Sequence, residues 1–412
     1  MNTQTITDQY TTNYTDKQPY NHHQDVYIPK YTIQPPHTYA TQLDHAILSW
    51  YQHNQLTTVQ RQQRRNCISR ISELIHSMFG SHVIIDVFGS YASDVQLHSS
   101  DIDIVIQNIY SSHNSVTRNS TTDESYMLQL QYELIYHNPP IASNIRYICD
   151  TPIPVIKYND NDTYIGVDIS IQHNGGTNGI KLIESAKNKY IYYKVLLLFM
   201  KSYLYNKQLS DSYLGGCRSY LCSILLIIHL QLHQQYNTSN DQRLSTLLIH
   251  YFEFYSTFDF NRFGIKIDNE FNVTIINRAD TTADDMIPTY PYITDPYDNT
   301  VNVGKSCYRW YKLIGSFKHT LKLIRDDINI YKYKQTHTDI IQHILIRNTR
   351  HQHYKRKYKY NHYNNQYDSD NDISTHTSYT TNSHKRHHNN DSTEYTDSDT
   401  LSYTATYTQS PT

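Results

Sequence analysis

Two short segments of this chain alternate aspartate with branched apolar residues, and this alternation constrains the fold more than any other feature. The first is SDIDIV at 100–105 and the second is VDISI at 167–171. Successive side chains of a β-strand point to opposite faces, so Asp101 and Asp103 project from one face while their isoleucine neighbours face a core. Asp168 stands in the same kind of setting. The pattern predicts buried strands with carboxylates on one surface of a sheet.

A glycine and a serine precede the aspartates in the segment VFGSYA at 87–92. We expect a strand to end and a helix to begin at Gly89 and Ser90, where free backbone N–H groups and the helix dipole favour a phosphate. Glycine lets a phosphate approach the backbone, and the Ser90 hydroxyl can add a hydrogen bond. This segment is therefore predicted to bind the phosphates of a nucleotide.

The three aspartates are predicted to be catalytic and to bind metal. Asp101 and Asp103 repel each other unless a cation lies between them, and Mg²⁺ prefers such oxygen ligands together with substrate phosphate. With Asp168 on an adjacent strand, three carboxylates can hold two metal ions for in-line phosphoryl displacement. Taken singly, an Asp-x-Asp pair is usually a solvated surface and a Gly-Ser pair a turn. Their combination at this spacing is much more specific.

The remaining periodicity predicts an α+β fold. Apolar spacing predicts helices within 43–79, and short runs rich in Val, Ile and Tyr predict strands at 83–88, 102–106, 154–158 and 164–171. Helical patterning returns from residue 178, most clearly at 191–205, 220–233, 245–258 and 306–324. A helical segment, a small α/β unit and a helical domain are expected in that order.

Both ends of the chain have a biased composition. Residues 1–40 are rich in Thr, Gln, Tyr, Asn and His and are predicted to be disordered, as is the low-complexity tail 348–412. Within that tail, 350–362 alternates Lys and Arg with Tyr, which suits RNA contacts, nuclear import or a solvated tail. The whole chain has 36 Lys+Arg against 38 Asp+Glu, so any affinity for nucleic acid must come from such local patches.

Cysteine usage and hydropathy argue against a secreted or membrane protein. None of the five cysteines forms a C-x-x-C pair, so neither a zinc site nor a disulfide framework is expected. The longest apolar run, 221–232, is too short to span a bilayer, and the first 20 residues lack an apolar signal-peptide core. We expect an intracellular, reduced and soluble protein.

The motif combination resembles the DNA polymerase β-like nucleotidyltransferase superfamily, and the rest of the chain resembles the noncanonical poly(A) polymerases of the nuclear RNA-surveillance (TRAMP) type. The resemblance covers about 43–325. Its diagnostic stretches are 88–106, 151–171, 215–233, 244–267 and 294–308. It implies a nucleotidyltransferase palm, a small mixed sheet with helices, at 82–176. It also implies a central, PAP-associated helical domain built from 41–81 and 177–347, with the NTP in a cleft between the two.

Carried over position by position, the resemblance assigns roles to the acidic residues and the phosphate-binding residues. Asp101 and Asp103 would bind both metals, and Asp168 would bind the metal that activates the RNA 3′-hydroxyl. Ser90, beside Gly89, and Lys201 would hold the triphosphate. Without the family match, Lys201 could equally extend its ammonium to the surface. Asp94 replaces a small residue usual in the family, and we expect that change only to alter the loop.

The resemblance places further nucleotide contacts in the helical part. Ser219 would also hold the triphosphate, Tyr220 would stack on the base, and Asn178 would bind the ribose. Ser219 could instead be only a helix N-cap, and Asn178 a turn residue. In the base-recognition loop Asn302 is preceded by Val301, whereas the family generally has Asn there.

These features predict a template-independent RNA 3′-end nucleotidyltransferase that adds adenylates from ATP. No histidine of the kind found in uridylyl-preferring relatives lies between residues 295 and 308, so adenine is favoured. The alternatives are a uridylyl- or mixed-nucleotide transferase and, in another class, a catalytically silent RNA-processing scaffold. Silent relatives generally lose one metal-binding carboxylate, and this chain retains all three.

The resemblance also implies cofactors and partners. Mg²⁺ is the expected metal, with Mn²⁺ as an alternative. RNA 3′ ends are the expected substrate, a zinc-knuckle RNA-binding protein and an RNA helicase are the expected partners, and no membrane association is expected. The expected location is the nucleus or nucleolus, with the cytoplasm as the alternative.

Overall fold

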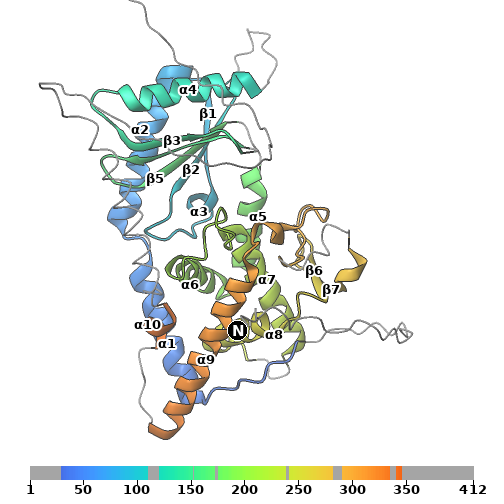
Figure 1. The fold of residues 1–412 in the computed structure, drawn as a ribbon. Helices are drawn as coiled ribbons and strands as arrows, with labels where there is room; N and C mark the ends of the chain where they lie inside the picture. The colour runs from blue at the N-terminus through green and yellow to red at the C-terminus, as the bar shows by residue number, and fades with distance from the viewer. Residues whose placement is uncertain are drawn as a thin grey trace, which may run out of the picture. The chain divides into compact units, whose positions relative to one another are not determined.

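The computed structural model describes most of the chain between residues 29 and 345 (Figure 1). The described ranges are 29–109, 120–151, 153–171, 175–237, 241–281, 290–334 and 340–345. The predicted basic segment at 350–362 lies outside them, as does the rest of the tail 348–412. No helix in the described ranges is both long and apolar enough to cross a membrane.

A five-stranded mixed sheet forms one half of the structure (Figure 1). Its strands lie in the order β1-β2-β5-β4-β3, and β2 and β5 run parallel while the other neighbours are antiparallel. The bounds are Ile84–Phe88 (β1), Ile102–Gln107 (β2), Ala142–Ile148 (β3), Val155–Asp160 (β4) and Gly166–Ile171 (β5). Four of these strands match the predicted runs. The sequence pattern did not predict β3, an edge strand in which polar residues interrupt the apolar alternation.

One face of this sheet is covered by two helices, α2 (Thr58–Phe79) and α4 (Ser120–Tyr136). The isoleucines of β2 and β5 are buried there against Ile71 and Leu74 of α2 and against Met127 and Leu130 of α4. We expected residues 41–81 to belong as one piece to the helical domain. In the structure, α2 packs on the sheet instead. The apolar stripe of α2 is completed by the sheet rather than by the other helices.

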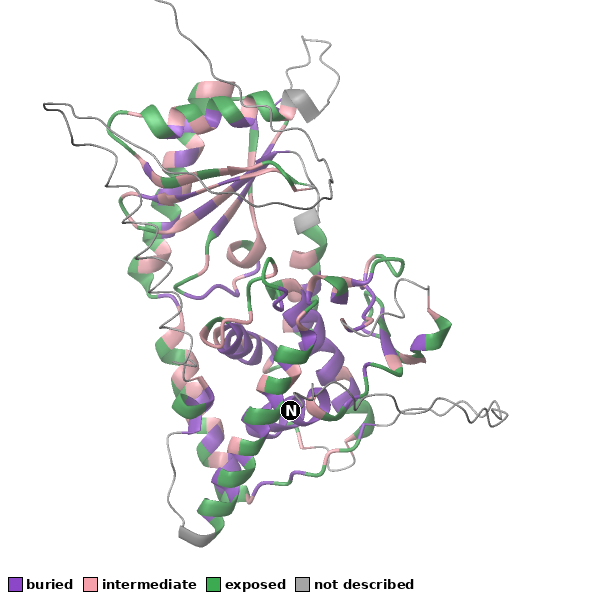
Figure 2. Ribbon diagram, viewed as in Figure 1, coloured by how far each residue is buried: buried purple, intermediate pink, exposed green. Residues whose placement is uncertain are grey.

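The second half is mainly helical, and Figure 2 shows its inner helices almost wholly buried. α6 to α8 form its centre, since nearly every residue from Tyr193 to Leu204, Leu221 to Leu232 and Leu244 to Tyr255 is buried. Its helices are α1 (His37–Asn54), α5 (Gly175–Lys189), α6 (Tyr193–Asn206), α7 (Ser219–Tyr236), α8 (Leu244–Thr257), α9 (Trp310–Lys334) and α10 (Ile340–Leu345). A hairpin of β6 (Phe263–Ile267) and β7 (Val273–Asn277) is added to it. The mixed architecture confirms the predicted α+β class.

The prediction of disorder for 1–40 is wrong for residues 29–40. α1 begins at His37, and the segment before it is bound to α8. The carboxylate of Glu253, only 2% exposed, accepts hydrogen bonds from the backbone N–H groups of Thr32 (3.0 Å) and Ile33 (3.3 Å) and from the Thr32 hydroxyl. Composition reports a lack of local apolar residues. It does not report a buried carboxylate far along the chain that orders the segment.

Candidate active site

The strand register brings the three predicted catalytic aspartates together. Asp103 of β2 lies directly opposite Asp168 of β5, and Asp168 lies directly opposite Lys157 of β4. Directly opposed residues of neighbouring strands project from the same face of a sheet. Asp101 precedes Asp103 by two positions and therefore belongs to the same side. The three predicted carboxylates and one lysine thus share one face, opposite the face covered by α2 and α4.

Two glycines make room for two of these carboxylates. Gly89 has a φ of +62°, and a Cβ there would lie 2.2 Å from Asp103 Oδ2. A Cβ on Gly166 would lie 2.3 Å from Asp101 Oδ1. No side chain fits at either position without displacing a carboxylate. The glycine of the Gly-Ser motif therefore has a second use, since it lets the end of β1 lie against Asp103.

The electrostatics of the acidic residues indicate a shortage of positive charge. Burial, followed by the negative charges of Asp168 and Asp101, raises the pKa of Asp103 to about 7. Burial and the charge of Asp168 also raise the pKa of Asp101. Lys157 forms an ion pair with Asp168, and its charge only partly offsets these effects. Carboxylates held together in this way favour a bound cation.

The donor set fits a hard divalent cation. All three candidate ligands are carboxylates, and the two glycines leave space beside Asp101 and Asp103. The raised pKa values of Asp101 and Asp103 indicate that a bound cation would stabilise their ionised forms. Across the described ranges, no three His, Cys, Asp or Glu side chains converge closely enough to hold a metal ion as they stand. Asp168 is ion-paired with Lys157 instead. Asp101 and Asp103 would be the first ligands, and Asp168 would join by exchanging its partner.

The loop after the Gly-Ser helix is held by lysines from the helical half. α3 spans Gly89–Ala92, so a helix does begin at the predicted residues, and the loop from Ser93 leads on towards β2. Lys187 Nζ donates to the Ser93 carbonyl (3.0 Å), and Lys201 Nζ donates to the Val95 carbonyl (2.7 Å).

Two arginines of α2 and one further lysine also hold this loop. Asp94 forms ion pairs with Arg61 (3.1 Å) and with Lys194. The buried Arg64 donates to the Leu97 and His98 carbonyls at 3.3 and 3.1 Å. The expectation that Asp94 only alters the loop is therefore wrong, because its carboxylate links α2 to α6. Sequence spacing could not reveal a contact between three separate segments.

Lys201 does not extend to the surface. Its side chain is buried, with the residue 9% exposed, and burial lowers the pKa of its ammonium to about 8. The negative charge of Asp103 favours its charged form. The structure therefore places Lys201 beside the Gly-Ser loop and within the electrostatic influence of the acidic face. Its predicted role in holding a triphosphate stays a prediction.

The predicted base-stacking residue is positioned by contacts with two other segments. Ser219 begins α7 and is exposed, and Tyr220 follows it. The Tyr220 hydroxyl donates to Asp295 Oδ2 at 2.9 Å, and a Cβ on Gly179 would lie 3.6 Å from the Tyr220 ring. Sequence reasoning missed Asp295. Gly179 therefore lies near the ring. The neighbouring Asn178 is exposed and lies inside α5 rather than in a turn, so it belongs to the same region.

Asn302 is a structural residue of its loop. It is 8% exposed, and its Oδ1 accepts hydrogen bonds from the backbone N–H groups of Ile293 (3.1 Å) and Gly304 (2.9 Å). It thereby caps the short 3₁₀ helix Val303–Ser306. If Asn302 affects nucleotide choice, part of that effect would come from its role in shaping the loop. A direct contact between Asn302 and the nucleotide stays a prediction.

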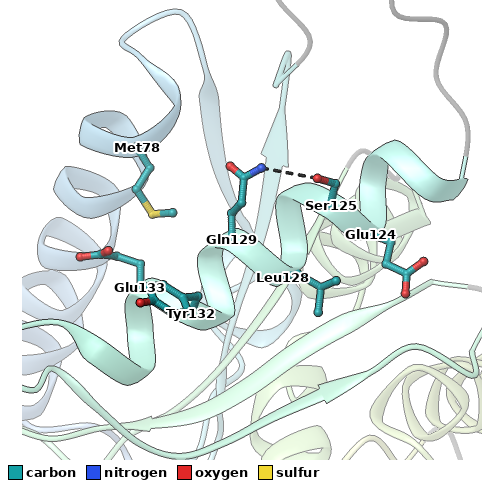
Figure 3. A pocket seen from close by; sticks show the side chains of 7 residues that line it. All are labelled: Met78, Glu124, Ser125, Leu128, Gln129, Tyr132 and Glu133. Carbon is teal, nitrogen blue, oxygen red and sulfur yellow. Dashed lines mark hydrogen bonds between the residues drawn. The ribbon is translucent and has the colours of Figure 1, made fainter. Parts of the chain in front are cut away.

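A pocket of about 620 Å³ lies elsewhere, on α4 and the end of α2 (Figure 3). It is lined by Met78, Glu124, Ser125, Leu128, Gln129, Tyr132 and Glu133, none of which is a predicted site residue. No Lys, Arg or His that could bind a phosphate is among the residues that line it. The candidate active site is therefore the group formed by Asp101, Asp103 and Asp168, and not this pocket.

Comparison with known proteins points to one family. The family model described as the central palm domain of mitochondrial-like poly(A) RNA polymerase matches residues 43–186. Poly(A) RNA polymerase cid14 of Schizosaccharomyces pombe is 25% identical over 268 residues, which cover 63% of this chain and 37% of that protein. Poly(A) RNA polymerase protein 1 of Saccharomyces cerevisiae is 26% identical over 269 residues, covering 63% and 40%.

The fold agrees with these matches. The solved polymerase core of TRAMP, described as an RNA surveillance complex, has a TM-score of 0.65 at 19% identity, covering 74% of this chain and 94% of that chain. This likeness extends well beyond the palm-domain match into the helical half. In sequence and in fold, the chain is similar to noncanonical poly(A) polymerases.

This similarity leaves the activity of the whole protein open. The matched segment spans only 37 to 40% of the length of the two curated fungal relatives. The Drosophila melanogaster protein Trf4-2, named as an inactive poly(A) RNA polymerase, is 25% identical over 272 residues, covering 65% of this chain and 64% of that protein. Relatives at this level of identity thus include proteins named as poly(A) RNA polymerases and one that is named as inactive. The residues of the site must distinguish them.

Proposed function

We propose that this chain is a template-independent nucleotidyltransferase that adds adenylates from ATP to RNA 3′ ends. The observation that supports this most strongly is the row formed by Asp103 and Asp168 in direct register, with Asp101 on the same side and a glycine beside each of Asp101 and Asp103. Keeping three carboxylates this close costs free energy, because burial and mutual repulsion raise the pKa values of Asp101 and Asp103. Such an arrangement is typical of residues that bind cations and reacting phosphates.

Asp101, Asp103 and Asp168 are proposed to hold two divalent cations, with Mg²⁺ favoured and Mn²⁺ as an alternative. Such cations, when bound, neutralise the developing charge on the transferred phosphoryl group and make a hydroxyl a better nucleophile. These three ligands are negatively charged carboxylates, and the paired strands hold them in place. Gly89 and Gly166 keep other side chains away from them.

The triphosphate is proposed to lie between the Gly-Ser loop and the α6 lysine. Ser90 and Ser219 offer hydroxyl donors, and Lys201 offers a positive charge. Burial weakens the hydration of the Lys201 ammonium, which strengthens its attraction to phosphate relative to water. The hydrogen bond from Lys201 to the Val95 carbonyl would keep this charge next to the loop.

The nucleoside is proposed to stack on Tyr220, with Asn178 at the ribose. Stacking tolerates every base because each has a π-face, so the ring by itself does not choose adenine. Base choice is assigned to the loop around Asn302, whose backbone is shaped by the Asn302 side chain. A uridylyl- or mixed-nucleotide transferase is the alternative outcome.

The wider setting is proposed from the family. The substrate would be RNA in processing, surveillance or decay, and the partners would be a zinc-knuckle RNA-binding protein and an RNA helicase. A nuclear or nucleolar location follows from such partners. Immunofluorescence and co-purification with tagged full-length protein would test these points.

A primer-extension assay tests the activity. Purified full-length protein is incubated with a 5′-labelled oligoadenylate primer, Mg²⁺ and each NTP separately. We expect extension with ATP and much weaker incorporation of other nucleotides. Preferential use of UTP would move the protein to the uridylyltransferase class, and no incorporation by a folded protein would support the silent scaffold.

Aspartate variants identify the site within the same assay. Asp101→Asn, Asp103→Asn and Asp168→Asn should each abolish extension while the protein stays folded by circular dichroism. The matched control is Asp86→Asn, which changes an exposed aspartate of β1. Substantial activity in any one of the three site variants would show that the site is wrongly placed.

A further inference from the structure

We propose that Lys157 is an internal counter-cation for Asp168, which a divalent cation must displace before Asp168 can become a ligand. The cation held by Asp101 and Asp103 would therefore bind first and more tightly, and the one at Asp168 second and more weakly. This inference rests on the proposed function, since it concerns the order in which the same carboxylates take up cations.

The strand register places the lysine at the site. Lys157 of β4 and Asp168 of β5 are directly opposed in an antiparallel pair, and Asp103 is the next residue across the sheet. The ammonium of Lys157 forms an ion pair with Asp168 Oδ2. An ammonium at this position supplies the positive charge that a metal ion would otherwise supply to the same carboxylate.

The three carboxylates are not equivalent in this respect. Within the described part of the chain, Asp168 has a lysine partner, whereas no Lys or Arg side chain forms an ion pair with Asp101 or Asp103. Gly89 and Gly166 also place no side chain beside those two carboxylates, so a cation can approach them without displacing a partner. A cation therefore gains more by binding at Asp101 and Asp103 than by competing with Lys157 for Asp168.

Lys157 also has the freedom to move aside. Its side chain is 35% exposed, compared with 19% for that of Asp168. A partly exposed lysine can turn its charged end into water, because its flexible stem allows other rotamers at little cost. Asp168 remains fixed by its strand. Exchange of the partner then requires only a side-chain movement.

Binding of Mn²⁺ to the full-length protein tests this order without relying on activity. Free Mn²⁺ is measured by electron paramagnetic resonance during a titration in the absence of nucleotide. The wild type should show a tighter and a weaker class of site, and Asp168→Asn should lose the weaker class. Lys157→Met should tighten the weaker class about tenfold, because an opposite charge at this distance changes the energetics of a carboxylate by about one pKa unit or more.

Two further variants separate charge from structure. Lys157→Arg keeps the charge and should bind Mn²⁺ like the wild type, and Lys266→Met, which changes an exposed lysine of β6, should have no effect. If Lys157→Met does not fold by circular dichroism, Lys157→Gln takes its place. The inference is overturned if the uncharged variant leaves the weaker class unchanged or shifts the tighter class instead. A wild type that neither binds Mn²⁺ nor extends primers would overturn the proposed function itself, which is a different result.

Discussion

Asp103 and Asp168 lie directly opposite each other on the parallel strands β2 and β5, although they are far apart in the chain. Their side chains must share one face of the sheet, and the charge of Asp168 disfavours the ionised form of Asp103. The pair is maintained because the apolar residues that alternate with it are buried under α2 and α4. The core thus holds together two groups that repel each other.

This repulsion should be measurable as a loss of stability. The pKa of Asp103 in the folded protein is about 7, above its ordinary value, so the folded state binds the proton more tightly than the unfolded state. Stability from this group is present at low pH and is lost as pH rises through about 7. At pH 8 with EDTA, Asp103→Asn should raise the free energy of unfolding by about 2–4 kcal/mol, since each pKa unit corresponds to about 1.4 kcal/mol.

Urea denaturation at two pH values checks this prediction. At pH 4 the wild-type carboxyl is protonated in the folded state, so the difference between the two proteins should nearly vanish. A variant that is less stable than the wild type at pH 8 would show that Asp103 contributes more by its contacts than it costs by its charge.

The buried Lys201 should give nucleotide use an alkaline limit. Burial lowers the pKa of its ammonium to about 8, so the free enzyme loses this positive charge as pH rises above that value. The kcat/KM for ATP should therefore fall above about pH 8, because that parameter follows the protonation of the free enzyme. Lys201→Arg, whose guanidinium stays charged, should remove this fall, and Lys201→Met should be weak at every pH. An identical alkaline limit in the arginine variant would assign the titration to another group.

Two substitutions at Tyr220 separate stacking from the hydrogen bond to Asp295. Tyr220→Ala should raise the KM for all four NTPs by roughly tenfold or more, since a stacked base contributes about 1–3 kcal/mol. Tyr220→Phe keeps the ring and removes only the 2.9 Å bond to Asp295 Oδ2, so its KM should change little. Steady-state primer extension with each NTP measures both. A selective effect on ATP alone would contradict base-independent stacking.

A buried histidine cluster lies away from the site, between α7, α8 and the segment before α1. His229 Nε2 donates to the Leu247 carbonyl (2.9 Å) and His250 Nε2 donates to the Ile33 carbonyl (3.1 Å). His233 Nε2 lies 3.0 Å from His250 Nδ1 and also 3.0 Å from the side-chain amide nitrogen of Asn237. Tyr31 stacks on His250 with ring centroids 4.5 Å apart. The cluster therefore places three imidazoles side by side in a buried region, where positive charges on them would repel one another.

Acid should destabilise the protein through this cluster. Burial, with the charge of His250, lowers the pKa of His233 to about 4, and burial also lowers the pKa values of His229 and His250. The unfolded state thus binds more protons, and stability is lost as pH falls from about 6.5 towards 4. His233→Gln should reduce this loss by up to about 3 kcal/mol, as measured by urea denaturation across that range. The exposed His319→Gln is the control, and an equal effect in both variants would contradict the assignment.

The local features of the chain could be predicted from the sequence because they depend on neighbouring residues. Alternation around Asp103 and Asp168 predicted two buried strands, and helix starts at Gly89 and Ser219 agree with the structure. The family resemblance also proved sound. The role of each site residue remains a prediction, since it concerns a bound nucleotide.

Other features depended on contacts between distant segments, and only the tertiary structure decided them. Strand order placed Lys157 opposite Asp168, and the packing of α2 and α6 brought Arg61 and Lys194 to Asp94. A buried glutamate ordered the segment that composition marked as disordered. The physical reason is the same in each case. Periodicity indicates which face of a helix or strand is apolar. Burial of those apolar faces sets the strand order and the helix contacts, and only then does a polar side chain acquire its partner.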